Sequence, residues 1–296
     1  MKRLLVLGAL IAMYISSVIA ADGSGDVRRV VMAAAREFDE VYVSGDATVE
    51  ICCNTRHAGL IVYNNASDES ERIRCYNDGT KLYIDGRCEQ HGVESRIVVF
   101  YDEPLKRIVN NGAGTILATR MPEESSIEVI LNGSGAIKLG KKMKLEKVTL
   151  INNGEGSIRI PMIKSSEVRI IANGTGAEPM GILKIRCDKL SAITNSSADI
   201  SIGDVKARDA SFVANAEGSI AVAGKVHEAT MASNGAGSIE AGKMSCNIVN
   251  ASSTSTGNID CRVKKSISAK VYGDGKISYR GNPDNVDANG TNVIAK

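Results

Sequence analysis

The chain has 296 residues, enough for one large domain or two small ones. Its charge is nearly balanced, with 36 Lys and Arg against 34 Asp and Glu, and 43% of its residues are hydrophobic. The balance argues against a bulk electrostatic attraction to nucleic acid or to an anionic membrane, and the apolar content excludes wholesale disorder.

The first twenty residues have the pattern of a secretory signal peptide. Lys2 and Arg3 form a positive start, residues 4–19 are mostly apolar, and small residues at Val18 and Ala20 precede a cleavage point. A membrane anchor is the weaker alternative, because the run is shorter than the ~20 residues that a span needs. We predict a signal peptide at 1–20, a linker at 21–35 and no transmembrane segment in the mature chain. The protein is expected in the periplasm, at the cell surface or outside the cell.

Residues 36–110 are predicted to form a module of short strands. Apolar and alternating runs indicate strands at 40–52, 59–63, 72–76, 81–84 and 95–101. The sequence Asn77-Asp78-Gly79-Thr80 is typical of a tight hairpin turn. This module either caps the open end of the structure that follows or supplies its first coil, with the hairpins as an excursion.

Residues with binding chemistry concentrate in this module. If the protein has a small-molecule or glycan site, the candidates are Tyr63, Tyr76, Tyr83, His57 and His91. Aromatic packing between short strands is the alternative interpretation of the same residues.

The cysteines are also concentrated in this module, which holds four of the seven. Export permits one or two disulfides within an early group, which consists of Cys52, Cys53, Cys75 and Cys88. Seven is an odd number, so at least one thiol has no partner within the chain. Cys261 occupies an apolar position of a predicted strand, and we expect it to be a small core residue.

A short phrase recurs from residue 111 onward. Asn-Gly-x-Gly-x-Ile occurs in full at Asn111, Asn132, Asn153 and Asn234. Degenerate copies begin at Asn173, Asn195, Asn215, Thr254 and Tyr272, and successive starts lie 18 to 22 residues apart. Self-similarity at such a fixed period is the sequence signature of stacked structural units.

Each period has the polarity of two strands joined by a turn. Apolar residues stand five and three positions before the start, and Ile stands five positions after it, as in Ile158-Arg159-Ile160. This alternation predicts strands with one buried face. The Asn-Gly and Gly-x-Gly sequences predict a bend between the strands, in which we expect the glycines to accept positive φ.

A stack of hairpins and a solenoid both fit such a period, because Asn-Gly is also a hairpin signal. The single turn phrase per period and the constant register favour coils that lie like over like. We therefore predict an all-β protein: a parallel β-solenoid of about nine coils at 111–283, the N-terminal hairpin module, and a tail at 284–296. The isoleucines should form one inner column and the asparagines one turn column.

After Asn173 the period lengthens to 22. This predicts a two-residue bulge at a corner, with a ligand-facing irregularity as the alternative.

The chain resembles the head GIN domain family of putative auto-transporter adhesins. The resemblance is carried by the strand end at 41–45 (Val-Tyr-Val-Ser-Gly), the repeated glycine turns, and the closing phrase Ile-Ser-Tyr-Arg-Gly-Asn-Pro at 277–283. It covers about residues 36–290. It implies a β-helical fold, a bacterial envelope location and adhesion, and it brings no catalytic residues. The chain departs from the family pattern in its cysteine content and in its weakened turns at Asn195 and Thr254.

The search for catalytic chemistry yields one weak candidate, the carboxylate pair Glu240 and Asp260. Both lie at the outward position after the column isoleucine, and they should be one coil apart. Such pairs serve in acid–base or metal sites, with solvated surface as the alternative. No nucleophile, zinc or phosphate-loop motif occurs in the sequence, and we predict no cofactor.

Two functions remain open from the sequence. The first is a non-enzymatic structural or interaction module of the cell envelope, with adhesin-like surface or glycan binding. Its partner would be a glycan, an envelope protein or another copy of itself, and not nucleic acid. The alternative is a polysaccharide-active enzyme on a β-helical wall. A groove lined by three or more convergent charged side chains would favour the enzyme, and a smooth wall would favour the module.

Overall fold

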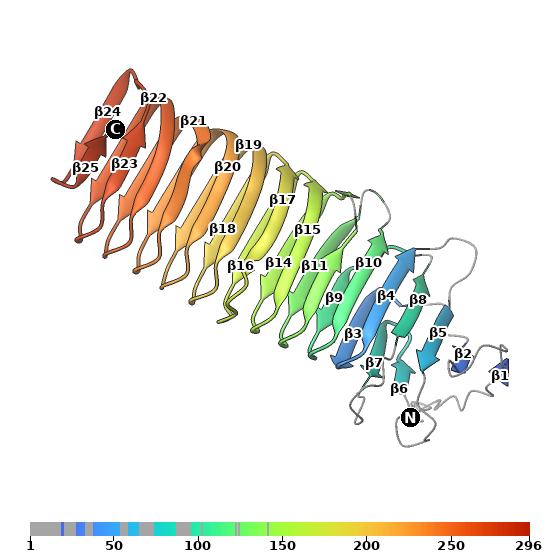
Figure 1. Ribbon diagram of the computed structural model, residues 1–296. Coiled ribbons are helices and arrows are strands. Elements are labelled where there is room, and N and C mark those ends of the chain that lie inside the picture. Colours follow the sequence, from blue (N-terminus) through green and yellow to red (C-terminus); the bar gives the residue numbers. More distant parts are fainter. Residues whose placement is uncertain are drawn as a thin grey trace, which may run out of the picture.

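The computed structural model describes residues 38–53, 74–86, 96–101, 103–121, 123, 125–140 and 142–296, and the backbone of 19–20, 28–32 and 59–64. All its regular elements are strands, which stack into one elongated solenoid (Figure 1). Within these residues, no helix has the length and apolar character to cross a membrane. The predicted signal peptide lies outside the described residues except for strand β1 (Ile19–Ala20).

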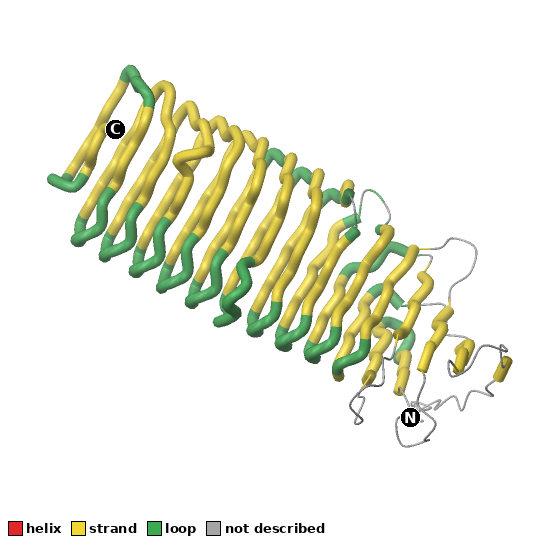
Figure 2. The backbone as a smooth tube through the Cα atoms, viewed as in Figure 1, coloured by secondary structure: helices red, strands yellow, loops and turns green. Residues whose placement is uncertain are grey.

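Each regular coil holds one strand before a glycine turn and one strand after it. The strands before the turns are β9 (Arg107–Asn110), β11 (Ser126–Leu131), β14 (Lys147–Asn152), β16 (Glu167–Ala172) and β18 (Lys189–Thr194). Those after the turns are β10 (Thr115–Arg120), β12 (Ala136–Leu139) with the short β13 (Met143–Lys144), β15 (Ser157–Lys164) and β17 (Met180–Arg186). The turns line up along one long edge of the molecule (Figure 2).

Further along the chain, the strand after one turn continues around the opposite edge into the strand before the next turn. This produces the long strands β19 (Ile200–Ala214), β20 (Ile220–Ser233), β21 (Ile239–Ser253) and β22 (Ile259–Val271). The last strands are β23 (Ile277–Arg280), β24 (Asn285–Asn289) and β25 (Val293–Ala295). Neighbouring coils pair in parallel throughout, which confirms the predicted solenoid over the hairpin stack.

The inner isoleucine column is present as predicted. Ile116, Ile137 and Ile158 align across three coils, and the column continues through Ile200, Ile220, Ile239, Ile259 and Ile277. All of these side chains are buried. Parallel coils place like residues over like, so this column forms a continuous apolar core that no single coil could make.

The irregular coil contains the predicted bulge. Arg159 aligns with Gly181, and Met180 aligns with Ile200, so Met180 takes the column position that Ile occupies elsewhere. Met180 is fully buried. The apolar phase therefore resumes at Met180, two residues earlier than the Ile182 that the sequence pattern indicated. The extra residues are accommodated at the exposed corner around Pro179.

The asparagines at the turn starts form a hydrogen-bonded ladder. The side-chain Nδ2 of each donates to the Oδ1 of the asparagine one coil earlier, at 2.7–2.8 Å, through Asn111, Asn132, Asn153, Asn173, Asn195, Asn215 and Asn234. Thr254 extends the series with a longer contact of 3.4 Å. This ladder confirms the predicted turn column and links the successive coils from Asn111 to Thr254 at the surface.

The turn glycines serve a purpose different from the predicted one. The prediction that they adopt positive φ is wrong, because positive φ among the described glycines occurs only at Gly45, Gly79, Gly224, Gly281 and Gly290. An added Cβ at Gly135 or Gly156 would lie 2.0 or 1.8 Å from a carbonyl oxygen of the preceding coil. The glycines are therefore needed because stacked backbones approach too closely for any side chain.

The residue just before each turn start often closes the turn from inside. Asn110 and Asn152 are fully buried, and their Nδ2 groups donate to the carbonyl oxygens of Gly114 and Gly156. Thr194, Ser233 and Ser253 make the same contact with their hydroxyls. A buried polar side chain that finds its partner within the turn costs little and specifies the turn's shape.

The N-terminal module contributes coils out of sequence order. Its strands are β2 (Arg28–Met32), β3 (Glu40–Gly45), β4 (Thr48–Cys53), β5 (Gly59–Asn64), β6 (Arg74–Asn77), β7 (Lys81–Gly86) and β8 (Arg96–Tyr101). Strands β3 and β4 pair in parallel with β9 and β10 on one side, and with β7 and β8 on the other. The predicted strand at 40–52 is thus two strands, which meet at Gly45 with a φ of 87°. They form a first coil, as the second interpretation of the module proposed.

Antiparallel strands occupy the outer side of this end. Strand β5 pairs with β8 and β6 pairs with β7, while β2 pairs with β5 and β1 with β2. The predicted linker therefore contains a strand, β2. These additions take up the hydrogen-bonding groups of β7 and β8, which would otherwise be an open sheet edge.

The C-terminal residues continue the stacking. Strand β24 pairs in parallel with β22, and β25 pairs in parallel with β23. The stretch predicted as a tail after residue 283 thus forms a further coil. Its side chains are mostly exposed, so this coil ends the apolar core.

The register predicts a sharp difference between two adjacent residues. Ile158 is fully buried, whereas Arg159 is exposed and forms an ion pair with Glu178 at 2.7 Å. We expect Ile158→Asp to lower the free energy of unfolding by more than about 4 kcal/mol, because it buries a carboxylate in place of an apolar side chain. Arg159→Asp should cost about 1 kcal/mol, the value of a surface pair. Equal losses in urea denaturation would contradict the register.

The close approach of the turns gives a second prediction. Gly156→Ala should destabilise the protein by about 2 kcal/mol or more, because the new methyl group overlaps the carbonyl oxygen of Gly135. Gly181→Ala is the matched control, since the nearest atom lies 3.9 Å from its added Cβ. It should change stability by about 0.5 kcal/mol at most. Thermal melting of both variants tests the pair, and a neutral Gly156→Ala would show that the coils can separate at the turn.

Candidate functional site

Three tyrosines stack on the outside of the N-terminal module. Tyr42 of β3 and Tyr83 of β7 are register partners, and Tyr83 in turn aligns with Tyr76 of β6. The ring centroids of Tyr42 and Tyr83 lie 5.2 Å apart, and those of Tyr76 and Tyr83 lie 5.9 Å apart, both at stacked angles. Tyr76 and Tyr83 are 48% and 37% exposed. We call these three residues the tyrosine surface.

Charged groups hold one end of this surface in place. The Tyr42 hydroxyl donates to the Glu40 carboxylate at 2.7 Å, and the Lys81 ammonium lies 5.6 Å from the centre of the Tyr42 ring. Arg107 donates to Tyr42 and to Glu128, and these bonds raise the pKa of Arg107. The Tyr42 ring is therefore fixed, while the rings of Tyr83 and Tyr76 extend the surface toward solvent.

The hairpin between β6 and β7 positions Tyr76 against Tyr83. Its turn is the predicted one: Gly79 has a φ of 94°, and its N–H donates to the Asn77 side chain at 2.7 Å. The backbone N–H groups of Lys81 and Thr80 donate to the Asp78 carboxylate, and they lower its pKa. This turn fixes the hairpin register, and with it the pairing of the two rings.

The structure brings together some of the predicted site residues. Tyr76 and Tyr83 meet as described, but sequence reasoning missed Tyr42 as the third member. The sequence did contain a signal for Tyr42: the alternation Val41-Tyr42-Val43 predicts that Tyr42 points outward, and Val41 and Val43 are both buried. The side chain of Tyr63 and all of His57 and His91 lie outside the described residues, so their part in a site stays a prediction.

Glu240 and Asp260 are register partners on adjacent coils, as predicted. Asp260 also accepts contacts from Arg280 and Lys296, each at 3.4 Å, so cations surround it. In the described part of the chain, no three His, Cys, Asp or Glu side chains gather in a way that could hold a metal ion. Asp260 therefore belongs to a surface ion network, and a catalytic role for the pair stays a prediction.

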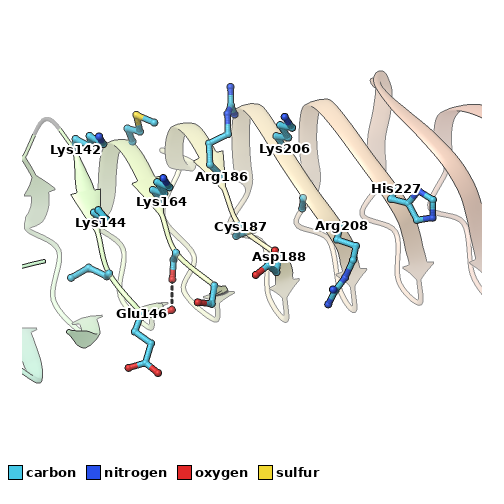
Figure 3. Close-up of a pocket in the computed structure, with 15 residues that line it drawn as sticks. Lys142, Lys144, Glu146, Lys164, Arg186, Cys187, Asp188, Lys206, Arg208 and His227 are labelled. Atoms are coloured by element: carbon cyan, nitrogen blue, oxygen red, sulfur yellow. Dashed lines mark hydrogen bonds between the residues drawn. The ribbon is translucent and has the colours of Figure 1, made fainter. Parts of the chain in front are cut away.

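A shallow groove of about 1220 Å³ runs along the edge of the coils away from the glycine turns (Figure 3). Six cationic side chains line it: Lys142, Lys144, Lys164, Arg186, Lys206 and Arg208. Glu146 and Asp188 are the two carboxylates in its lining. The wall is thus not smooth, and this charged groove meets the condition that the sequence analysis set in favour of the polysaccharide-active enzyme.

Sequence reasoning did not find this groove. The available signal was the spacing of its basic residues, because Lys144, Lys164, Arg186 and Lys206 are separated by 20, 22 and 20 residues. These intervals match the repeat period. The lysines sit at a corner outside the Asn-Gly phrase, where the sequence pattern is least regular.

The cysteines separate into core and surface residues. Cys261 is buried, as predicted, and so is Cys246 on the neighbouring coil. Burial raises the pKa of both thiols to about 12. Cys75 also carries a free thiol. Cys88 lies outside the described residues, so the predicted disulfides of the early group stay a prediction.

A family comparison covers much of the solenoid. Residues 162–283 match the family model described as putative auto-transporter adhesin, head GIN domain. This confirms the resemblance that the glycine turns and the closing phrase indicated. No curated protein matches the chain.

Three solved structures align with most of the chain. A putative adhesin from Parabacteroides distasonis has a TM-score of 0.53 at 12% identity, covering 93% of this chain and 96% of its own. A putative adhesin from Parabacteroides merdae has a TM-score of 0.46 at 14% identity, covering 93% and 95%. A putative lipid binding protein from P. distasonis has a TM-score of 0.40 at 18% identity, covering 93% and 99%. The likeness to the first of these is a likeness of fold.

Buried thiols give a prediction for the core. Cys246 and Cys261 should react with iodoacetamide at pH 8 at least about 100-fold more slowly in the folded protein than in urea, because the thiolate is the reactive form. Peptide mass spectrometry measures this.

The raised pKa also means that the fold favours the protonated thiol. The free energy of unfolding should therefore fall as pH rises from about 8.5, the unfolded pKa, toward about 12. Cys261→Ala should reduce that fall, and rapid labelling at pH 8 would contradict the burial.

Proposed function

We propose that the protein is an exported, non-enzymatic interaction module of the bacterial cell envelope, which binds glycans through the tyrosine surface. The observation that carries the proposal is the exposed stack of Tyr76 and Tyr83 against an anchored Tyr42. The match of residues 162–283 to an adhesin family and the signal-peptide pattern of residues 1–20 support it.

Stacked tyrosines suit a sugar ligand for a physical reason. One face of a pyranose ring is lined by C–H groups and packs on an aromatic ring, while its hydroxyls require polar partners at the rim. Aromatic residues with a few polar groups are typical of such sites. Here Lys81, Glu40 and Arg107 supply donors and acceptors next to the rings.

The solenoid supports this role because it carries the tyrosine surface on a stack of hydrogen-bonded coils. Its coils carry the module at one end of a long parallel stack (Figure 1). Because the rings come from strands that are hydrogen-bonded to one another, the surface is formed before any ligand arrives. Little ordering entropy is then lost on binding.

A second candidate is a polysaccharide-active enzyme, and the groove is the observation that favours it. Acid–base catalysis would fall to Glu146 and Asp188, its two carboxylates. However, the Glu146 side chain points away from the lysine side chains (Figure 3). The backbone links Glu146 to Ser166 and Ser166 to Asp188, so a whole coil separates the carboxylates. This arrangement supports binding better than cleavage.

Paired substitutions test the tyrosine surface. We expect Tyr76→Ala with Tyr83→Ala to weaken binding on an array of neutral glycans by about tenfold, since each ring contributes about 0.5–1.5 kcal/mol. Tyr272→Ala is the control, because Tyr272 is 69% exposed at a distant turn. Thermal melting establishes that both variants fold.

Three results would contradict the proposal. The first is neutral-glycan binding that the double variant leaves unchanged, and the second is an array that the natural protein does not bind at all. The third is the release of new reducing ends when the protein is incubated with neutral or acidic polysaccharides, which would establish an enzyme.

A further inference from the structure

We propose that a column of basic side chains on the edge away from the turns binds a linear acidic polysaccharide. The column consists of Lys144, Lys164, Arg186, Lys206, Lys225, Arg262 and Arg280, with Ser245 between Lys225 and Arg262. We call it the basic column. It lies on a different part of the coils from the tyrosine surface, so each proposal can fail without the other.

The alignment of the basic column is set by backbone pairing. Lys144 is the register partner of Lys164, Lys164 of Arg186, and Arg186 of Lys206. Lys206 then pairs with Lys225, which is followed through Ser245 by Arg262 and Arg280. Neighbouring strands lie about 4.8 Å apart, so the column spans roughly 34 Å. Lys164, Arg186 and Lys206 stand in this order along the groove (Figure 3).

Several of these cations have no internal counter-ion. Within the described part of the chain, no carboxylate lies within ion-pair distance of Lys164, Lys206, Lys225 or Arg262, and all four are exposed. Lys144 pairs with Glu123 at 2.6 Å, Arg186 with Asp204 at 2.5 Å and Arg280 with Asp260 at 3.4 Å. Along the column, Lys164 lies between the paired Lys144 and Arg186. Lys206, Lys225 and Arg262 lie between the paired Arg186 and Arg280. Among the described residues, cations without a counter-ion are therefore spread along the whole edge.

The fold does not require like charges to align here. Elsewhere on the solenoid, opposite charges face each other between coils: Lys147 pairs with Glu167 at 3.0 Å, and Arg107 with Glu128 at 2.7 Å. Stacking cations at strand spacing instead adds repulsion between neighbours. The strands that hold Lys164, Arg186 and Lys206 are paired on both sides, so these cations are not protecting an open sheet edge either.

A linear polymer with evenly spaced negative charges fits this arrangement. The strand spacing is close to the length of one sugar ring along an extended polysaccharide, so the uronate carboxylates on the side of such a chain that faces the protein recur at a multiple of the coil spacing. Single-stranded nucleic acid fits less well, because proteins that bind it combine basic grooves with aromatic side chains for the bases. In the described part of the chain, the lining of the groove contains no Phe, Tyr or Trp, and His227 is its single aromatic ring. The net charge is a sum over the whole chain, so a value near zero does not conflict with a local cluster of cations at this edge.

The test compares two triple variants with equal charge. Lys164→Gln, Lys206→Gln and Lys225→Gln remove three members of the basic column. Lys138→Gln, Lys270→Gln and Lys276→Gln remove three exposed lysines from other faces of the coils. Fluorescence anisotropy measures the binding of labelled polygalacturonate to the full chain between about 50 and 200 mM salt, where counter-ion release makes affinity fall steeply. Thermal melting confirms that both variants fold.

We expect the column variant to bind polygalacturonate at least tenfold more weakly than the natural protein, with a shallower salt dependence, and the control variant to change less than twofold. Neutral dextran should not bind at this edge. Equal losses in the two variants would overturn the proposal, because they would indicate general charge attraction. Absence of polygalacturonate binding, or tighter binding of a single-stranded oligonucleotide through the same lysines, would also overturn it.

Discussion

The structure depends on how closely one coil lies on the next at the glycine turns. At Gly135 and Gly156 there is no room for a methyl group above the carbonyl oxygen of the coil below. That contact lets the turn backbones hydrogen-bond from coil to coil, as Gly135 does to Gly112 at 3.1 Å. If the turns were held apart, the strands on either side would lose the backbone hydrogen bonds that join one coil to the next. The isoleucine column would then open to water.

Constant stacking turns a repeated sequence into columns of like side chains. Inside the coils it makes an apolar core from Ile137, Ile158 and their equivalents. At the turns it makes a ladder of asparagine amides, in which each side chain both donates and accepts. On the outside it makes a stack of tyrosine rings and a line of cations. Each feature takes its spacing from the β-sheet, so its ligands are expected to be extended and regular.

The N-terminal end shows how such a stack is closed. The coil formed by β7 and β8 lies outside the coil formed by β3 and β4, although it follows that coil in sequence. Antiparallel strands β5 and β6 then cover it. The same excursion brings Tyr76 and Tyr83 onto Tyr42, so the tyrosine surface exists because the chain departs from simple coil order. Closure of the stack and the site we propose there share one structural cause.

The sequence by itself determined the parallel coils, their register, the buried isoleucines and the asparagine column. These follow from local alternation and a fixed period, and both are readable without knowing any long-range contact. It also indicated Tyr76 and Tyr83 as binding candidates, because tyrosines concentrate in the N-terminal module.

Only the tertiary structure decided the order of the first coils, the reason for the turn glycines and the basic column. Coil order depends on which strand edges pair, and several pairings satisfy the same polarity pattern. The glycines resemble bend residues in sequence, because a clash with a backbone one coil away leaves no local signal. Lys164 and Arg186 become neighbours only once the bulge before Met180 has restored the register. The spacing of these basic residues is visible in the sequence, but it does not show that the coils stay in register at this corner, which lies outside the Asn-Gly phrase.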